Sequence, residues 1–146
     1  MYVKTGKVYQ VYRNFPLGFH ANAPAAAYAA ICAGDQDPEL FWEMHDWLFE
    51  TQQTWQNAQD AGAQFRAQAV ALGADGALFD ACIADPQTKA QVDKDMQDAT
   101  ALGVRGTPAF FIYKMVNGQP QGDARPLSGA LPFAQFSQVL DEILAQ

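Results

Sequence analysis

The sequence predicts an α/β fold in which one strand precedes a long helical stretch and a hairpin follows it. Three observations predict this order: a β-branched and aromatic segment near the start, repeated helix start and stop signals over residues 21–102, and an apolar run followed by Asn117-Gly118. Strands favour β-branched and aromatic residues, and Asn-Gly between such segments is a strong hairpin signal. We therefore expect one strand, four or five helices, a hairpin and a last helix.

The first strand is predicted over Lys7–Arg13, which reads KVYQVYR. It ends at Asn14 and Pro16, because proline cannot donate to a strand ladder. The residues before it look like the last turn of a helix with Gly6 as its cap. We expect the body of that helix to be missing from this chain.

The helical stretch is predicted from capping residues, prolines in first turns, and glycines that end helices. The expected helices run from Asn22 to Ala33, from Asp37-Pro38 along an apolar face to Leu48, from Ala63 to Leu72, from Asp75 past Cys82, and from Asp85-Pro86 to Leu102. Between the second and third of these, residues 51–62 are polar, and we expect a loop anchored by Trp55.

The last third of the chain is predicted to form the hairpin and a terminal helix. An apolar strand follows Pro108 and continues to Met115, and a Gly/Pro-rich connection leads to a short strand near Leu127-Ser128. Pro132 begins the last helix, whose apolar residues recur at helical spacing. These residues are Phe133, Phe136, Val139, Leu140, Ile143 and Leu144.

Composition narrows the class of protein and of partner. A length of 146 residues predicts a single domain, and 49% hydrophobic with 17% charged residues is typical of globular proteins. The net charge of −7 argues against nucleic acid and anionic membranes as partners, because both are polyanions. No apolar run reaches 18 residues, and the first residues lack the apolar core of a signal peptide. We expect a protein, peptide or small-molecule partner, no membrane span and no cofactor.

The two cysteines, Cys32 and Cys82, stand too far apart in sequence for a local redox dithiol. Their separation leaves either a long-range bridge or two free thiols. No Cys-x-x-Cys occurs anywhere in the chain.

Several motifs in order resemble the DsbA-like family of thioredoxin-fold thiol:disulfide oxidoreductases, over essentially the whole chain. They are KVYQVYRNFPL at 7–17, HANA at 20–23, AAICAGDQ at 29–36, FWEMHDWLF at 41–49, GVRGTP at 103–108 and Gly129-Ala130. The resemblance implies an α/β, thioredoxin-like (DsbA-like) fold, one domain over residues 1–146, with a helical insertion over about 21–102. In that family a strand, the Cys-x-x-Cys and most of a long helix precede the position of Met1, so the first βα unit is expected to be truncated.

The resemblance also implies roles for four residues. Thr107 and Pro108 correspond to a cis-proline turn at which the family binds substrate, although this proline is also explained if only the turn before the strand needs it. Cys32 and Cys82 occupy positions where some members carry a second, structural bridge. Two buried thiols and a reactive pair are the alternatives for these cysteines.

Candidates for other chemistry are few. His20 and His45 are the only histidines, and neither has a nucleophile beside it in sequence, so the catalytic residues are unknown and His20 is a weak candidate. A zinc site from both histidines and both cysteines lacks short ligand spacing, and no metal is expected. The two serines lie in no Gly-x-Ser-x-Gly motif, which argues against a serine hydrolase.

The absent strand is expected to leave a gap in the sheet. A strand inserted by a partner chain, an exchange of elements between two copies, or the predicted first strand sliding beside the hairpin would close it, and we expect a homodimer or strand exchange. Three functions remain open: most of an oxidoreductase that is redox-silent as given because the Cys-x-x-Cys is absent, a stand-alone dimeric module that binds peptide or protein, and an enzyme with a newly acquired non-redox activity. Placement outside the cytoplasm, periplasmic or secreted, is implied by the resemblance alone.

Overall fold

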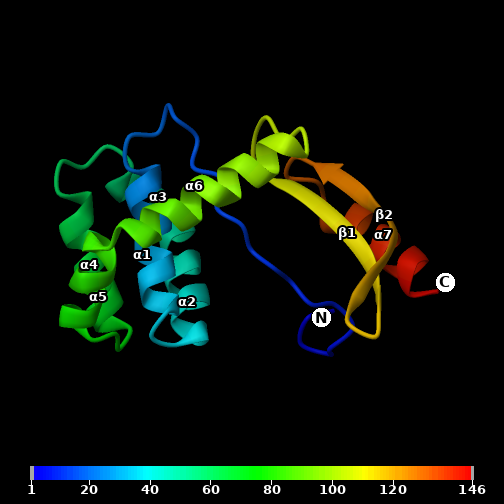
Figure 1. Ribbon diagram of the computed structural model, residues 1–146, viewed down its shortest axis with the longest axis horizontal. Coiled ribbons are helices and arrows are strands. Elements are labelled where there is room, and N and C mark those ends of the chain that lie inside the picture. The colour runs from blue at the N-terminus through cyan, green and yellow to red at the C-terminus, as the bar shows by residue number, and fades with distance from the viewer. Residues whose placement is uncertain (1, 146) are drawn as a thin grey trace. The chain divides into compact units, whose positions relative to one another are not determined.

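The computed structural model describes residues 2–145 and divides the chain into two compact units. The helical unit is Arg13–Ala101. The hairpin unit comprises the rest of the described chain, residues 2–12 and 102–145. The first unit consists of helices and loops, and the second pairs strands into a sheet beside a helix (Figure 1).

The helical unit contains the predicted helices and one further short helix. They are α1 (Ala23–Gly34), α2 (Pro38–Glu50), the short α3 (Gln52–Trp55), α4 (Ala61–Ala71), α5 (Gly76–Ala84) and α6 (Pro86–Ala101). The Asn22 side chain, predicted to cap α1, makes no capping hydrogen bond. The Asp37 carboxylate accepts from the Glu39 backbone N–H at 2.8 Å, and the Asp75 carboxylate accepts from two N–H groups of α5. Such caps satisfy backbone donors that have no partner inside the helix. The expected loop after α2 contains the single turn of α3.

The core of the helical unit forms around α1, whose small side chains let neighbouring helices approach closely. Phe65 of α4 and Met44 of α2 are fully buried there, and the rings of Trp47 and Trp55 pack edge-on against Phe65. The Trp55 indole N–H donates to the Leu48 carbonyl at 2.9 Å, so the expected anchor of the α2–α4 connection is present.

The turn between α1 and α2 depends on a glycine. A Cβ placed on Gly34 would lie 2.7 Å from the Cβ of Phe41, closer than carbon atoms approach without a shift. The absence of a side chain at Gly34 therefore lets the first turn of α2 pack directly on the end of α1.

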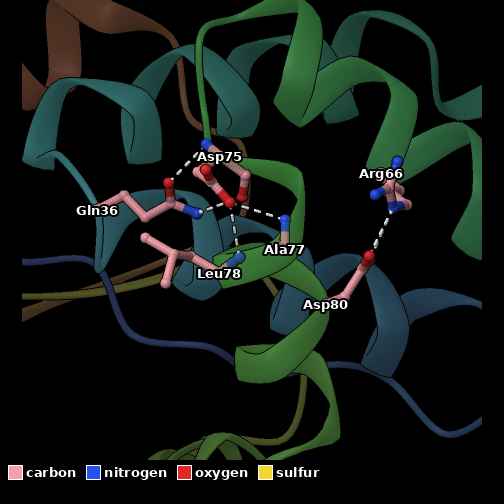
Figure 2. A network of polar contacts seen from close by, with 6 residues as sticks. All are labelled: Gln36, Arg66, Asp75, Ala77, Leu78 and Asp80. Atoms are coloured by element: carbon pink, nitrogen blue, oxygen red, sulfur yellow. Dashed lines mark hydrogen bonds and ion pairs between the residues drawn. The ribbon is translucent and has the colours of Figure 1, made fainter.

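Two polar contacts join α5 to its neighbours in the helical unit, as Figure 2 shows. The Asp75 backbone N–H donates to the Gln36 side-chain oxygen at 2.7 Å, and the Gln36 amide donates back to the Asp75 carbonyl at 3.2 Å. Arg66 of α4 donates through Nε to both carboxylate oxygens of Asp80, at 2.7 and 3.0 Å. This hydrogen bond and the adjacent charge lower the pKa of Asp80 and raise that of Arg66.

The hairpin unit contains antiparallel strands β1 (Ala109–Val116) and β2 (Gln119–Ser128). Asn117 and Gly118, with φ of 51° and 77°, form the two-residue turn, which confirms the Asn-Gly prediction. The second strand is longer than the predicted segment near Leu127-Ser128, because pairing resumes beyond an irregularity opposite the β1 segment between Ile112 and Lys114.

Helix α7 (Phe133–Leu144) covers one face of the hairpin, with Phe136 packed edge-on against Phe110 at 4.7 Å between ring centroids. The Arg125 side chain of β2 donates to the Glu142 carboxylate of α7 at 3.1 Å. No residue of the hairpin unit that the structure describes is buried. This unit is therefore a single layer of strands with one helix, without a closed core.

The strand predicted over Lys7–Arg13 is wrong. Within residues 2–145 this segment pairs with no strand, and Tyr9 is 87% exposed. High β-propensity records how a residue fits beside neighbouring strands, so it has little effect where no neighbour is present.

The expected glycine cap before that segment is present. The Lys7 N–H donates to the Tyr2 carbonyl at 3.1 Å and the Gly6 N–H donates to the Val3 carbonyl at 2.9 Å, with Gly6 at φ 70°. This is the Schellman pattern in which helices end. The turn is held to α7 by the Tyr2 hydroxyl, which donates to the Asp141 carboxylate at 2.7 Å.

Candidate functional site

The turn that precedes β1 is exposed and is held to the end of the hairpin. Thr107 and Pro108 both lie on the surface, and the peptide bond between them is cis. The Pro108 carbonyl accepts from the Gly129 backbone N–H at 2.8 Å, just after β2 ends. The turn therefore presents Thr107 at the start of β1.

The outer edge of β1 has no neighbour in the described chain, because the sheet consists of β1 and β2 only. A strand directs backbone N–H and C=O groups to both of its sides, so an edge strand exposes a row of donors and acceptors that another chain can pair with. The β1 edge begins directly after Thr107-Pro108, so the turn and the edge form one continuous surface.

The outer edge of β2 is less suited to pairing. Pro120 and Pro126 each lack an N–H, and Gly122, with φ of 67°, lies within the irregular stretch of the strand. By contrast, β1 contains no proline over its eight residues. Among the two strands of this sheet, β1 therefore offers the more regular edge.

One face of β1 is apolar and uncovered. Side chains alternate along a regular strand, so Phe111 lies on the face of β1 opposite to the one where Phe110 meets α7. Tyr113 and Met115, at and beyond the irregularity between Ile112 and Lys114, are both exposed. We call these three residues the open face. Met115 is 54% exposed and Tyr113 is 42% exposed. Apolar side chains beside a free strand edge are suited to an extended segment with apolar residues of its own.

Charge is distributed unequally between the two units. The helical unit has four basic and thirteen acidic side chains, for a net charge of −9. The hairpin unit has five basic and three acidic side chains, for a net charge of +2. The acidic composition of the whole chain therefore conceals a basic hairpin unit.

Cys32 and Cys82 form a disulfide that joins α1 to α5 within the helical unit, whereas Thr107 and Pro108 belong to the hairpin unit. Cys32 is fully buried and Cys82 is partly exposed. The Asp35 carboxylate lies 3.8 Å from the Cys82 sulfur. A thiolate of another molecule that attacked the Cys82 sulfur would meet this negative charge. It would also leave the Cys32 sulfur as a buried thiolate, and both effects disfavour thiol–disulfide exchange.

The two histidines both lie in the helical unit. The His20 ring packs against Phe19 at 4.4 Å between centroids, and its backbone N–H donates to the Leu17 carbonyl. His45 contacts Asp46 through Nδ1 at 2.9 Å and packs among aromatic rings of α2. Residues 2–145 contain no group of three or more His, Cys, Asp or Glu side chains placed to hold a metal ion.

Asp95 is a buried carboxylate that our sequence reasoning missed. It accepts from the Asn14 backbone N–H at 3.0 Å and from the Arg13 guanidinium at 3.2 Å, which fixes the entry of the chain into the helical unit. Its place three residues after the buried Val92, on the same side of α6, was the available signal.

A thioredoxin family model matches residues 1–129. The chain therefore belongs to the thioredoxin family, and its α/β architecture is thioredoxin-like, as the sequence predicts. No solved structure matches the chain at a comparable level.

The curated relatives are similar to this chain over part of their length. Na⁺/H⁺ antiporter NhaA 1 of Salinispora arenicola is 37% identical over 103 residues, and Na⁺/H⁺ antiporter NhaA of Herminiimonas arsenicoxydans is 31% identical over 102 residues. Each match includes 70% of this chain, and the chain spans about 15% of the length of the curated relatives it matches. Among residues 2–145, no helix is both long and apolar enough to cross a bilayer.

Proposed function

We propose that this protein is a DsbA-like member of the thioredoxin family that binds an extended segment of another polypeptide along the β1 edge and the Thr107-Pro108 turn. The observation that carries the proposal is the outer edge of β1, which has no strand beside it among the described residues. Backbone pairing along this edge supplies affinity that is independent of sequence, and the open face adds apolar contacts.

We propose further that the 146 residues do not themselves oxidise the bound segment. Thiol–disulfide exchange in a dithiol catalyst requires two neighbouring cysteines, one with a low thiol pKa. Here both cysteines are used in one bridge between α1 and α5, and one of its sulfurs is buried. We assign this bridge a structural role.

Two peptide-oxidation reactions test the redox part of the proposal. A reduced two-cysteine peptide is mixed with equimolar protein, either the chain as given or the C32S/C82S double variant, and free thiols are counted over time. Neither protein is expected to oxidise the peptide. Oxidation by the chain but not by the double variant would make Cys32–Cys82 a redox centre.

Photo-crosslinking tests the binding part. Replacing the exposed Tyr113 of β1 by p-benzoylphenylalanine is expected to give crosslinks to an extended apolar peptide. The matched control replaces Phe49 of α2, which is also an exposed aromatic residue. Equal crosslinking from both positions, or crosslinking from α2 alone, would contradict binding at β1.

We propose that two copies pair along the same β1 edge when no peptide is bound, because an uncovered regular edge is a template for another strand. Light scattering during size-exclusion chromatography should give the mass of a dimer, which an excess of peptide converts to monomers. A monomer at every concentration would contradict the dimer without affecting the crosslinking result.

We place the protein outside the cytoplasm, in the periplasm or secreted. A disulfide that spans 50 residues persists most readily in an oxidising compartment. Rapid acid quenching of cells, followed by alkylation of free thiols, should leave Cys32 and Cys82 unmodified. Alkylation of both in most molecules would indicate a reducing compartment.

A further inference from the structure

We propose that the β1 edge selects extended segments that have an apolar centre flanked by acidic side chains. This inference rests on the proposed function and specifies the chemistry of the partner. It is drawn from two cations of the hairpin unit, Arg105 and Lys114, and from their positions along the edge.

Both cations lack a carboxylate partner. Among the described residues, no Asp or Glu oxygen lies within 4.0 Å of the Arg105 guanidinium or the Lys114 ammonium, and neither group has another charged contact. By contrast, Arg125 of β2 is paired with Glu142 on α7. The two unpaired cations can therefore bind a carboxylate of a partner without breaking an existing ion pair.

Their positions bracket the surface that a docked strand would follow. Arg105 lies just before the Thr107-Pro108 turn, and Lys114 lies towards the far end of β1. A strand paired with β1 would place a side chain about 4.5–5.5 Å from Lys114, and its end beyond Ala109 would extend towards the segment that contains Arg105. Between the two cations the partner meets Phe111 and Tyr113 of the open face, and residues 106–113 contain no charged side chain.

Ion pairs between these two cations and the bound segment decide whether acidic segments are preferred, because exposed charges more than about 10 Å apart are largely screened at 0.1 M salt. The net charge of −7 would by itself predict avoidance of acidic partners. The hairpin unit, at +2, reverses that prediction for a segment bound along β1.

The test measures fluorescence anisotropy with three labelled peptides of equal length. They share one apolar, strand-forming centre and differ only in their flanks, which carry two Glu, two Gln or two Lys. We expect the Glu peptide to bind about two- to twentyfold more tightly than the Gln peptide, since each cross-strand ion pair contributes modestly. We expect the Lys peptide to bind most weakly, and 0.5 M salt to reduce the differences.

Two matched variants locate the effect. R105Q/K114Q should remove most of the preference for the Glu peptide while retaining binding of the Gln peptide. K89Q/K94Q changes the net charge equally on α6, where both lysines are paired with aspartates, and should preserve the preference.

Each contrary result has a separate meaning. Equal affinity of the wild-type chain for all three peptides would overturn the acidic preference and leave binding at β1 intact. A preference that persists in R105Q/K114Q would overturn its assignment to these residues. Binding of none of the peptides, together with no crosslinking from Tyr113, would overturn the proposed function as well.

Discussion

The helical unit and the hairpin unit exclude water to very different degrees. In the first, helices α2, α4 and α5 pack around α1, and side chains such as Phe65 and Met44 are completely buried. A disulfide joins two of these helices. In the second, the described residues include none that is buried, and the open face of β1 and the outer side of α7 remain accessible.

The difference indicates where each unit obtains its stability. A layered core removes apolar surface from water on all sides, whereas a two-stranded hairpin with one helix does so on one side only. The helical unit is therefore expected to be the stable part. The proposed docking of another strand along its edge would add stability to the hairpin unit, so we expect binding and folding of this unit to be coupled.

Two Phe→Ala substitutions should give the largest contrast. Phe65→Ala leaves a cavity in the core and is expected to lower the free energy of unfolding by about 3–5 kcal/mol. Phe110→Ala, at a ring that is 36% exposed, should cost clearly less. Urea unfolding followed by tryptophan fluorescence reports the first, because all three tryptophans lie in the helical unit, and amide exchange in β1 reports the second. Equal costs would contradict the comparison.

Removing the disulfide is the next test of the difference in stability between the two units. In the chain-entropy description a bridge across 50 residues stabilises by up to about 4 kcal/mol, and the C32S/C82S variant should lose about 2–4 kcal/mol. Amide exchange should accelerate in α1 and α5 while the rate in β1 is unchanged. In the native protein the buried Cys32 sulfur should keep the bridge resistant to dithiothreitol until urea unfolds the helical unit. Rapid reduction without unfolding would argue for a labile bridge.

A glycine pair tests the packing of α1 against α2. Gly34→Ala should lower the free energy of unfolding by about 1–3 kcal/mol, because its methyl group would overlap Phe41. Gly62→Ala, near the start of α4, meets no atom within 4 Å and should be neutral or stabilise by up to about 1 kcal/mol. Urea midpoints of both variants provide the measurement, and similar effects would show that the α1–α2 contact adapts.

The smallest expected effect concerns pH. Because the Arg66 hydrogen bond lowers the pKa of Asp80 below 3.8, the folded state binds this proton less readily than the unfolded chain does. The contribution of the Arg66–Asp80 pair to the free energy of unfolding is therefore present above about pH 4. It is lost as the pH falls through the pKa that Asp80 has in the folded state. Asp80→Asn should reduce the urea midpoint slightly at pH 7 and not at pH 2. The control Glu43→Gln on α2 should leave the urea midpoint unchanged at both pH values. Both groups of the pair are exposed, so solvent screens the ion pair and its contribution to stability is small.

The helices of this protein could be predicted with useful accuracy because their signals are local. Asp37 and Asp75 cap helices in the structure as the sequence indicates, and Asn117-Gly118 forms the expected hairpin turn. The Cys32–Cys82 pairing was implied by the DsbA resemblance and is present. The low reactivity that we expect of this disulfide was not predictable from the sequence spacing. It depends on how α1 and α5 pack, because that packing buries one sulfur and places Asp35 near the other.

The site was predictable in part. The role of Thr107 and Pro108 stays a prediction from the motif, whereas the unpaired β1 edge could not be predicted, because it depends on which strands are neighbours. The failure at Lys7–Arg13 has the same cause: a strand is completed by hydrogen bonds from another part of the chain, and here residues 2–145 supply none. The buried Asp95 also required the structure, since its partners lie more than 80 positions away.

By itself, the sequence determined the elements whose signals lie within a few residues of one another: helix caps, the Asn-Gly turn, the apolar stripe of α7 and the motif before β1. Tertiary structure alone decided which strands pair, which carboxylate is buried and which cations have no partner. Capping and turn formation involve neighbours along the chain, whereas pairing, burial and ion contacts depend on segments brought together in space.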